Sequence, residues 1–249
     1  MRRIFSTLCC LLVGHVVLAQ DEQNTIQTDR PDQTETPAIV PTGMFQVETG
    51  LLYEKINSEA ESIIAPTILW KYGVNENFEL RLITELSFEE NSGIKTSGLQ
   101  PVLVGFKAKL SEETGILPKT SFIGHLLIPD MASKDYKADY YASEFRFVMQ
   151  HTFSETFSFS YNLGAEWDGV TPQPTFIYTA ALGYSVSPKL GAFIELYGFA
   201  PQEDVAHHLF DGGLTYLVSN DFMVDFSGGF SLTENAPDYF ISTGFSFRI

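Results

Sequence analysis

The sequence predicts an all-β fold, a transmembrane antiparallel up-and-down β-barrel of about 12 strands. Segments of about 10 residues alternate apolar and polar side chains from residue 44 onward, which is the pattern of strands with one apolar face. Only 18% of the residues are charged, against about 25% in typical soluble domains. The last such segment also ends on an apolar residue, which a closed barrel in lipid tolerates because its last strand pairs with its first.

The alternation justifies the first six strands in order. The expected strands cover residues 45–54, 63–72, 78–86, 102–110, 120–129 and 143–150. The second contains Pro66, which cannot donate to a ladder and therefore requires broken or bulged pairing there. The fifth alternates least clearly, and the direction of His125 within it stays open. Polar or turn-forming residues separate the six segments.

The last six strands begin with the clearest case of alternation, the segment at 157–167. They are expected at 157–167, 176–186, 190–199, 207–218, 222–230 and 239–249. In the last one, the apolar face consists of Tyr239, Ile241, Thr243, Phe245, Phe247 and Ile249, and the other face of Phe240, Ser242, Gly244, Ser246 and Arg248. This strand is expected to close the barrel against residues 44–55 and to be recognised by the barrel-insertion machinery.

Connections of alternating length predict the orientation of the barrel. Residues 154–156, 187–189 and 219–221 form short turns, whereas the intervening loops are mostly longer and residues 111–119 are an exception. Outer-membrane barrels have short periplasmic turns and long external loops. The protein is therefore expected in the cell outer membrane. An even number of strands then places both termini on its periplasmic side. A secreted β-sandwich is the alternative, but its outer face would carry more charge and its apolar face would need a second sheet.

Two segments precede the barrel, which is expected to span residues 44–249. Residues 1–19 have the features of a cleaved signal peptide, with an apolar run from Leu8 to Leu18 followed by Ala19. Both cysteines, Cys9 and Cys10, lie in it, so the mature chain is expected to have no disulfide or thiol site. No later run reaches about 18 uninterrupted apolar residues, which excludes helical spans.

Residues 20–43 are polar and interrupted by prolines, which excludes a regular helix or central strand. We expect a periplasmic lead-in or a plug that folds into the barrel mouth. In the plug, four charged residues would pair with charges in the lumen. These are Asp29, Arg30, Asp32 and Glu35. A disordered periplasmic tail is the alternative.

The charged residues of the strands fall on the face opposite the apolar one, because Lys or Arg on the lipid side costs about 2–4 kcal/mol at the midplane. The candidates to line the lumen and contact a substrate are Glu48, Glu79, Arg81, Glu85, Lys107, Glu144, Arg146, Glu166, Glu195, Asp211, Asp225 and Arg248. A polar pathway for solutes is one interpretation of this set. A network of ion pairs that only braces a narrow barrel is the other.

The six expected loops hold twelve acidic residues against three basic ones. These loops are residues 56–62, 87–98, 130–139, 168–174, 200–206 and 232–238. A negative outer rim favours cations and neutral solutes over anions, so weak cation selectivity is expected if the barrel conducts.

Catalytic and metal-binding patterns are absent from the sequence. It contains no Gly-x-Ser-x-Gly and no His-Glu-x-x-His. His207 and His208 lie near Asp204 and Asp211, but adjacent histidines of a strand point to opposite faces and share a metal with difficulty. We therefore expect no catalytic residue, no metal and no cofactor. The net charge of -16 also argues against nucleic acid as a partner.

The start of the chain resembles a known family. Thr28-Asp29-Arg30-Pro31 precedes Pro41-Thr42-Gly43-Met44-Phe45-Gln46-Val47-Glu48-Thr49-Gly50, with the spacing P-x-G-x-x-Q-x-E-x-G. These residues are similar to the opening of the outer-membrane transporter family described as MetA-pathway of phenol degradation. The resemblance implies an outer-membrane barrel for uptake of small solutes, aromatic or hydrophobic ones included. It brings no binding residues with it.

The expected function is that of an outer-membrane channel or transporter for small solutes. A non-conducting structural or adhesive barrel is the alternative, and an outer-membrane hydrolase is the third candidate. The expected partners are outer-membrane lipid and lipopolysaccharide, the barrel-insertion machinery and a small-molecule solute.

Overall fold

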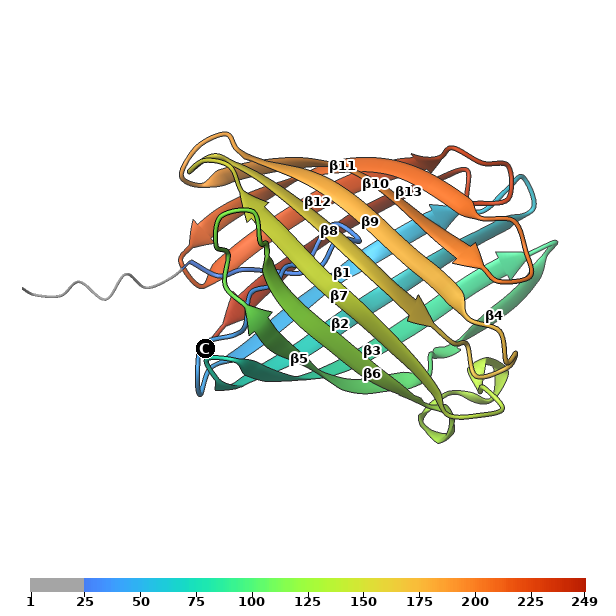
Figure 1. Cartoon of the computed structure of the whole chain (residues 1–249). Coiled ribbons are helices and arrows are strands. Elements are labelled where there is room, and N and C mark those ends of the chain that lie inside the picture. The colour runs from blue at the N-terminus through green and yellow to red at the C-terminus, as the bar shows by residue number, and fades with distance from the viewer. Residues whose placement is uncertain (1–24) are drawn as a thin grey trace, which may run out of the picture.

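A computed structural model describes residues 25–249 and shows a closed antiparallel β-barrel (Figure 1). The expected signal peptide lies outside the described residues. The strands are β1 (Phe45–Lys55), β2 (Ala60–Asn75), β3 (Phe78–Asn91), β4 (Ile94–Leu99), β5 (Val102–Ser111), β6 (Lys119–Ile128), β7 (Ala142–Thr152), β8 (Phe157–Glu166), β9 (Thr175–Ser185), β10 (Leu190–Pro201), β11 (His207–Ser219), β12 (Phe222–Ser231) and β13 (Tyr239–Arg248). Two short 3-10 helices, η1 (Pro129–Met131) and η2 (Lys134–Tyr136), lie in the loop after β6.

The first and last strands close the barrel, as the sequence predicts. β1 pairs with β2 on one side and with β13 on the other, and the register places Val47 opposite Phe247 and Gly50 opposite Gly244. Every other strand of the wall pairs with its neighbours in sequence. The ring of strands therefore closes on itself, which is the condition for a sheet in lipid, and β4 extends beyond it with a pairing to β3 alone among the described strands.

The wall has the expected twelve strands, but the fourth consists of two pieces. β3 pairs first with β5, from Phe78 opposite Ala108, and then with β4, up to Asn91 opposite Ile94. Pro101 lies in the two-residue gap between β4 and β5, where a residue without an N–H interrupts the ladder.

The expectation of a loop at 87–98 is therefore wrong. β3 and β4 continue as a hairpin around Ser92 and Gly93, both of which have positive φ. Because Glu89, Glu90 and Lys95 give this hairpin polar residues on both faces, the sequence pattern did not distinguish it from a loop.

Pro66 lies in a bulge of β2, as predicted. The pairing with β3 shifts between Ile64 and Thr67, so both residues point inward although they are three positions apart. A bulge adds a residue to one strand and changes which side chains face the interior. This change of phase places Lys71 inside the barrel.

The outer surface is apolar and the interior is polar. In β13, Ile241 and Phe245 are each 43% exposed, whereas Ser242, Ser246 and Arg248 are buried. The other strands of the wall show the same arrangement, with apolar residues outside and polar ones inside. Charged side chains such as Lys107 and Glu195 are buried. Within residues 25–249, no helix is long and apolar enough to cross a membrane.

Residues 25–43, which we call the inner segment, run into the barrel from the end that carries the C-terminus (Figure 1). Ile26 donates its N–H to Asn220 in the short β11–β12 turn, and Gly43 donates to Gly73 near the end of β2. Between these two attachments the segment contacts side chains that point inward from the wall. The interior of the barrel is therefore filled in part by its own N-terminal chain.

The outward face of β13 permits a test of which surface meets lipid. Phe245→Arg, near the middle of the strand, is expected to lower the free energy of unfolding by about 2–4 kcal/mol, and Tyr239→Arg at the strand end by about 0–1 kcal/mol. Urea unfolding in liposomes, followed by heat-dependent gel migration, measures both. An equal effect of the two changes would contradict the depth dependence.

Candidate functional site

Asp29 is the centre of a buried charge cluster inside the barrel. Its carboxylate lies 2.9 Å from Lys71 Nζ, 3.1 Å from Arg81 Nη1 and 2.8 Å from Lys107 Nζ. These cations come from β2, β3 and β5, so one residue of the inner segment joins three strands. Burial alone would raise the pKa of Asp29, but Lys107, Lys71 and Arg81 hold it well below the usual range.

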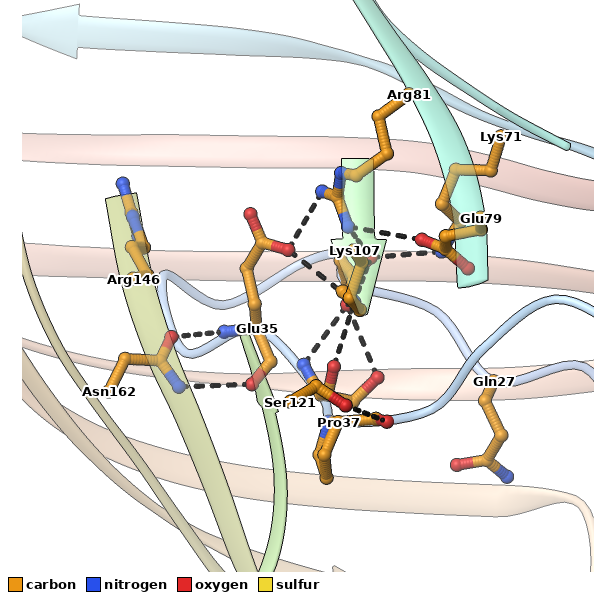
Figure 2. Close-up of polar contacts among 12 residues, drawn as sticks. Gln27, Glu35, Pro37, Lys71, Glu79, Arg81, Lys107, Ser121, Arg146 and Asn162 are labelled. Atoms are coloured by element: carbon orange, nitrogen blue, oxygen red, sulfur yellow. Dashed lines mark hydrogen bonds and ion pairs between the residues drawn. The ribbon is translucent and has the colours of Figure 1, made fainter. Parts of the chain in front are cut away.

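Three further acids complete this cluster, and Figure 2 shows two of them, Glu35 and Glu79, beside Arg81. Arg81 lies 2.7 Å from a carboxylate oxygen of Glu35 and 3.3 Å from one of Glu79. Lys71 also pairs with Glu48. A buried cation without partners would cost several kcal/mol, so this interleaving is what lets the charges remain in the interior.

Arg30 occupies a notch in the seam where the barrel closes. Its guanidinium donates to both oxygens of Asp225, at 2.9 and 3.3 Å, and to the Ser242 hydroxyl at 3.0 Å. The paired residues Gly50 and Gly244 make room for it, because a Cβ at either position would lie within 2.6 Å of Arg30 Nη2. These glycines are needed for close approach of the arginine.

Acidic side chains of the wall accept the backbone N–H groups of the inner segment. Glu48 Oε2 accepts those of Asp29 and Arg30, at 2.8 and 3.0 Å. Glu195 accepts the N–H of Gln33 at 2.8 Å, and Glu79 accepts that of Val40 at 2.8 Å.

Neutral polar groups bind the rest of the segment. Asn162 accepts the N–H of Glu35 at 2.8 Å and donates to its carbonyl at 3.1 Å (Figure 2). Ser121 donates to the carbonyl of Pro37 at 2.8 Å. The Thr34 hydroxyl donates to the Thr179 hydroxyl at 2.6 Å. Because the segment is irregular, its backbone has few partners of its own, and side chains of the wall satisfy it instead.

The twelve candidate lumen residues all lie on the inward faces of their strands, where they divide into two groups. Those that contact the inner segment are Glu48, Glu79, Arg81, Lys107, Arg146, Glu195 and Asp225. The others are Glu85, Glu144, Glu166, Asp211 and Arg248. Glu144 pairs with Arg146 at 2.5 Å and lies 3.3 Å from His125, which points inward.

The sequence prediction missed Lys71 and the neutral partners of the segment. Lys71 was missed because the bulge at Pro66 reversed the alternation before it. Asn162, Ser121 and Thr179 were visible only as polar residues of a strand face, since nothing in the sequence indicates which of them meets the inner segment.

Histidine chemistry is not assembled here. His208 Nδ1 contacts the hydroxyl of Tyr178 in β9, and among the described residues no acid joins the pair. Among residues 25–249, no group of three or more His, Cys, Asp or Glu side chains is arranged to hold a metal ion.

Cavities lie on two sides of Arg30–Asp32. One of about 420 Å³ is lined by this tripeptide and by the ends of strands that join the short turns, including Thr156 and Ser185. Another, of about 150 Å³, is lined by the same tripeptide together with Leu52, Glu85 and Asp211. A larger pocket of about 730 Å³, near Tyr140 and Trp167, involves outward-facing residues of the loop-end rim and does not belong to the lumen.

Asp32 and its surroundings are acidic. Burial and the nearby carboxylates of Glu195, Asp211 and Asp29 raise the pKa of Asp32 well above its usual range. The inner segment therefore has a cation-rich side at Asp29 and an acid-rich side at Asp32.

Comparison with known proteins agrees with the architecture. The model of the family described as "Putative MetA-pathway of phenol degradation" matches residues 28–249. An outer membrane channel from Pseudomonas putida F1 is similar in structure, with TM-score 0.67 and 13% identity over 85% of this chain and 97% of that one. The NanC porin gives TM-score 0.54 and 10% identity over 82% and 100%. No curated protein matches in sequence. At these identities the structural likeness shows the fold alone.

The charge cluster predicts a large effect of neutralising Asp29. Asp29→Asn leaves Lys71, Arg81 and Lys107 with too little negative charge nearby. The free energy of unfolding is expected to fall by about 3–5 kcal/mol. We expect the inner segment to detach while the barrel stays closed. Protease cleavage within residues 25–43, with heat-dependent gel migration retained, measures this.

Glu76→Gln, which changes an exposed acid in the β2–β3 turn, is the matched control and is expected to behave as wild type. Equal protection of the segment in Asp29→Asn and wild type would contradict the central role of Asp29.

Proposed function

The chain belongs to the family described as "Putative MetA-pathway of phenol degradation", and on that premise we propose that it is an outer-membrane channel for small solutes, closed at rest by its inner segment. The lumen provides the path, and the segment controls it. Both termini lie in the periplasm.

The observation that carries this proposal is the position of Arg30–Asp32. These residues line both the cavity of about 420 Å³ and the cavity of about 150 Å³. A solute that travels along the barrel therefore meets the tripeptide as a partition between two spaces. Movement of a few residues is enough to join them.

The contacts of the segment suit a closure that can be reversed. Many of its ties to the wall are hydrogen bonds and ion pairs, whose partners are Glu, Asp, Lys, Arg, Asn, Ser and Thr. Water can replace the partners of such hydrogen bonds and ion pairs when it enters the lumen. It could not replace the contacts of a packed apolar plug in this way.

The orientation follows from the connections. The inner segment and the C-terminus lie at the end of the barrel with the short turns, such as those after β7, β9 and β11. Short turns are periplasmic in outer-membrane barrels. The acidic outer loops and the neutral or acidic partners of Asp32 favour cations and uncharged solutes.

A non-conducting barrel is the competing function, and a specific observation favours it. The segment contacts inward residues from β1, β2, β3, β5, β6, β7, β8, β9, β10, β12 and β13, so it braces most of the wall. Such bracing would leave the barrel closed under all conditions. An outer-membrane hydrolase is the third candidate, and the sequence contains no Gly-x-Ser-x-Gly and no His-Glu-x-x-His to support it.

Removal of the segment separates these two functions. A chain that lacks residues 24–43 is expected to give a single-channel conductance several times that of wild type, because Arg30–Asp32 no longer divides the lumen. Recording in planar bilayers measures it. Asp29→Asn combined with Arg30→Gln and Glu35→Gln keeps the chain length and is expected to open more often than wild type. Unchanged conductance and stability after the deletion would rule out the segment as the closure.

The charge of the loops predicts the ion preference of the open channel. The reversal potential in a salt gradient at low ionic strength is expected to show weak cation selectivity, and the preference should fall as salt screens the loops. Anion preference under these conditions would contradict the prediction.

A further inference from the structure

The smaller cavity beside Arg30–Asp32 has an unusual lining. We call it the acidic cavity; its volume is about 150 Å³. It is lined by Arg30, Pro31, Asp32, Gln33, Leu52, Ile64, Thr67, Glu85, Asp211, Phe240 and Ser242. One side is therefore the inner segment, and the others are β1, β2, β3, β11 and β13.

Carboxylates outnumber cations around this cavity. Asp32, Glu85 and Asp211 line it, and Glu195 stands opposite Asp211 in the β10–β11 register. Arg30 is the cation among the lining residues, and Asp225 already binds its guanidinium through two contacts. The cavity is therefore lined by more carboxyl groups than cations, and its arginine is already paired.

Asp211 points to a missing ligand. Asp211 is 2% exposed, and no N–H or O–H group of the described residues donates to its buried Oδ1 atom, although its carboxyl group also lies within hydrogen-bonding reach of Glu195. The neighbouring acids have partners: Glu195 accepts from Gln33 and Thr34, and Glu85 accepts from Thr67 at 2.9 Å. A buried carboxylate oxygen with no partner is costly, so a bound cation or a proton must compensate it.

Part of the cavity wall is apolar and is formed by Leu52, Ile64 and Phe240. Phe240 is buried in a cluster with Tyr197, Leu209 and Ala236, and Leu52 packs against this cluster. An aromatic face attracts an organic cation, whose alkyl groups also gain from burial against Leu52 and Ile64. A metal ion would instead require several ligands in fixed geometry, and no such group exists among residues 25–249.

We propose that the acidic cavity binds one small organic cation of the alkylammonium class, with its charge against Asp211 and Asp32 and its alkyl groups against Phe240, Leu52 and Ile64. A cavity of this volume accepts a molecule about the size of benzene. The assignment gives a solute class to the proposed channel and rests on that function for its biological meaning. Binding itself requires no conduction.

Calorimetric titration of the refolded full chain in detergent micelles tests the site. Tetramethylammonium chloride is the probe, and tert-butyl alcohol is an uncharged molecule of similar shape. We expect saturable binding of one tetramethylammonium per chain and no saturable binding of the alcohol. Equal binding of both would identify an apolar pocket and overturn the proposal, as would the absence of binding by the cation.

Two variants locate the site. Asp211→Asn keeps the side-chain shape and is expected to weaken tetramethylammonium binding at least tenfold, whereas the control Glu76→Gln keeps wild-type affinity. Leu52→Phe fills the cavity without changing its charge and is expected to abolish binding. This variant still tests the site if Asp211→Asn fails to fold. Wild-type affinity in either folded variant would overturn the assignment.

Failure of this inference and failure of the channel are distinguishable. Binding of tetramethylammonium in micelles without current in bilayers would support the binding site and contradict the channel function. Current in bilayers without binding of the probe would support the channel function and contradict the binding site.

Discussion

Closure of the hydrogen-bond ladder is the constraint on which the rest of this structure depends. A sheet in lipid has no water to satisfy an open edge, so β13 must return to β1. Closure divides every strand into a lipid face and an inner face. Phe245 can then be exposed and Ser246, the next residue, fully buried. The distribution of charge along the whole chain follows from this division.

A barrel with many charged side chains in its interior creates a second requirement. Lys71, Arg81 and Lys107 are removed from water in the interior, where unpaired charges are costly. The wall alone provides only some of the acids they need, and Asp29 and Glu35 of the inner segment provide the others. The segment in turn uses Glu48 and its neighbours on the wall to satisfy its own backbone. Each half of the interior is therefore incomplete without the other.

Much of the fold could be predicted from the sequence because the period of two persists through almost every strand. The exceptions have local physical causes. Pro66 predicts a bulge but not its consequence, since the shift in register that brings Lys71 inside depends on pairing with β3. The hairpin of β3 and β4 looks like a loop because it is polar on both faces. The Gly50 and Gly244 pair acquires meaning only when the two strands are placed side by side.

The sequence by itself determined the barrel, its apolar outer face and most of the charged residues that point inward, with Lys71 as the exception, because a strand face is a local property that alternation records. Only the tertiary structure decided which of these charges meet. Asp29 lies 42 positions from Lys71 and 78 from Lys107, and no local pattern encodes that encounter. The terminal strand that predicts the fold is one wall of the notch that holds Arg30, and this role arises from barrel closure.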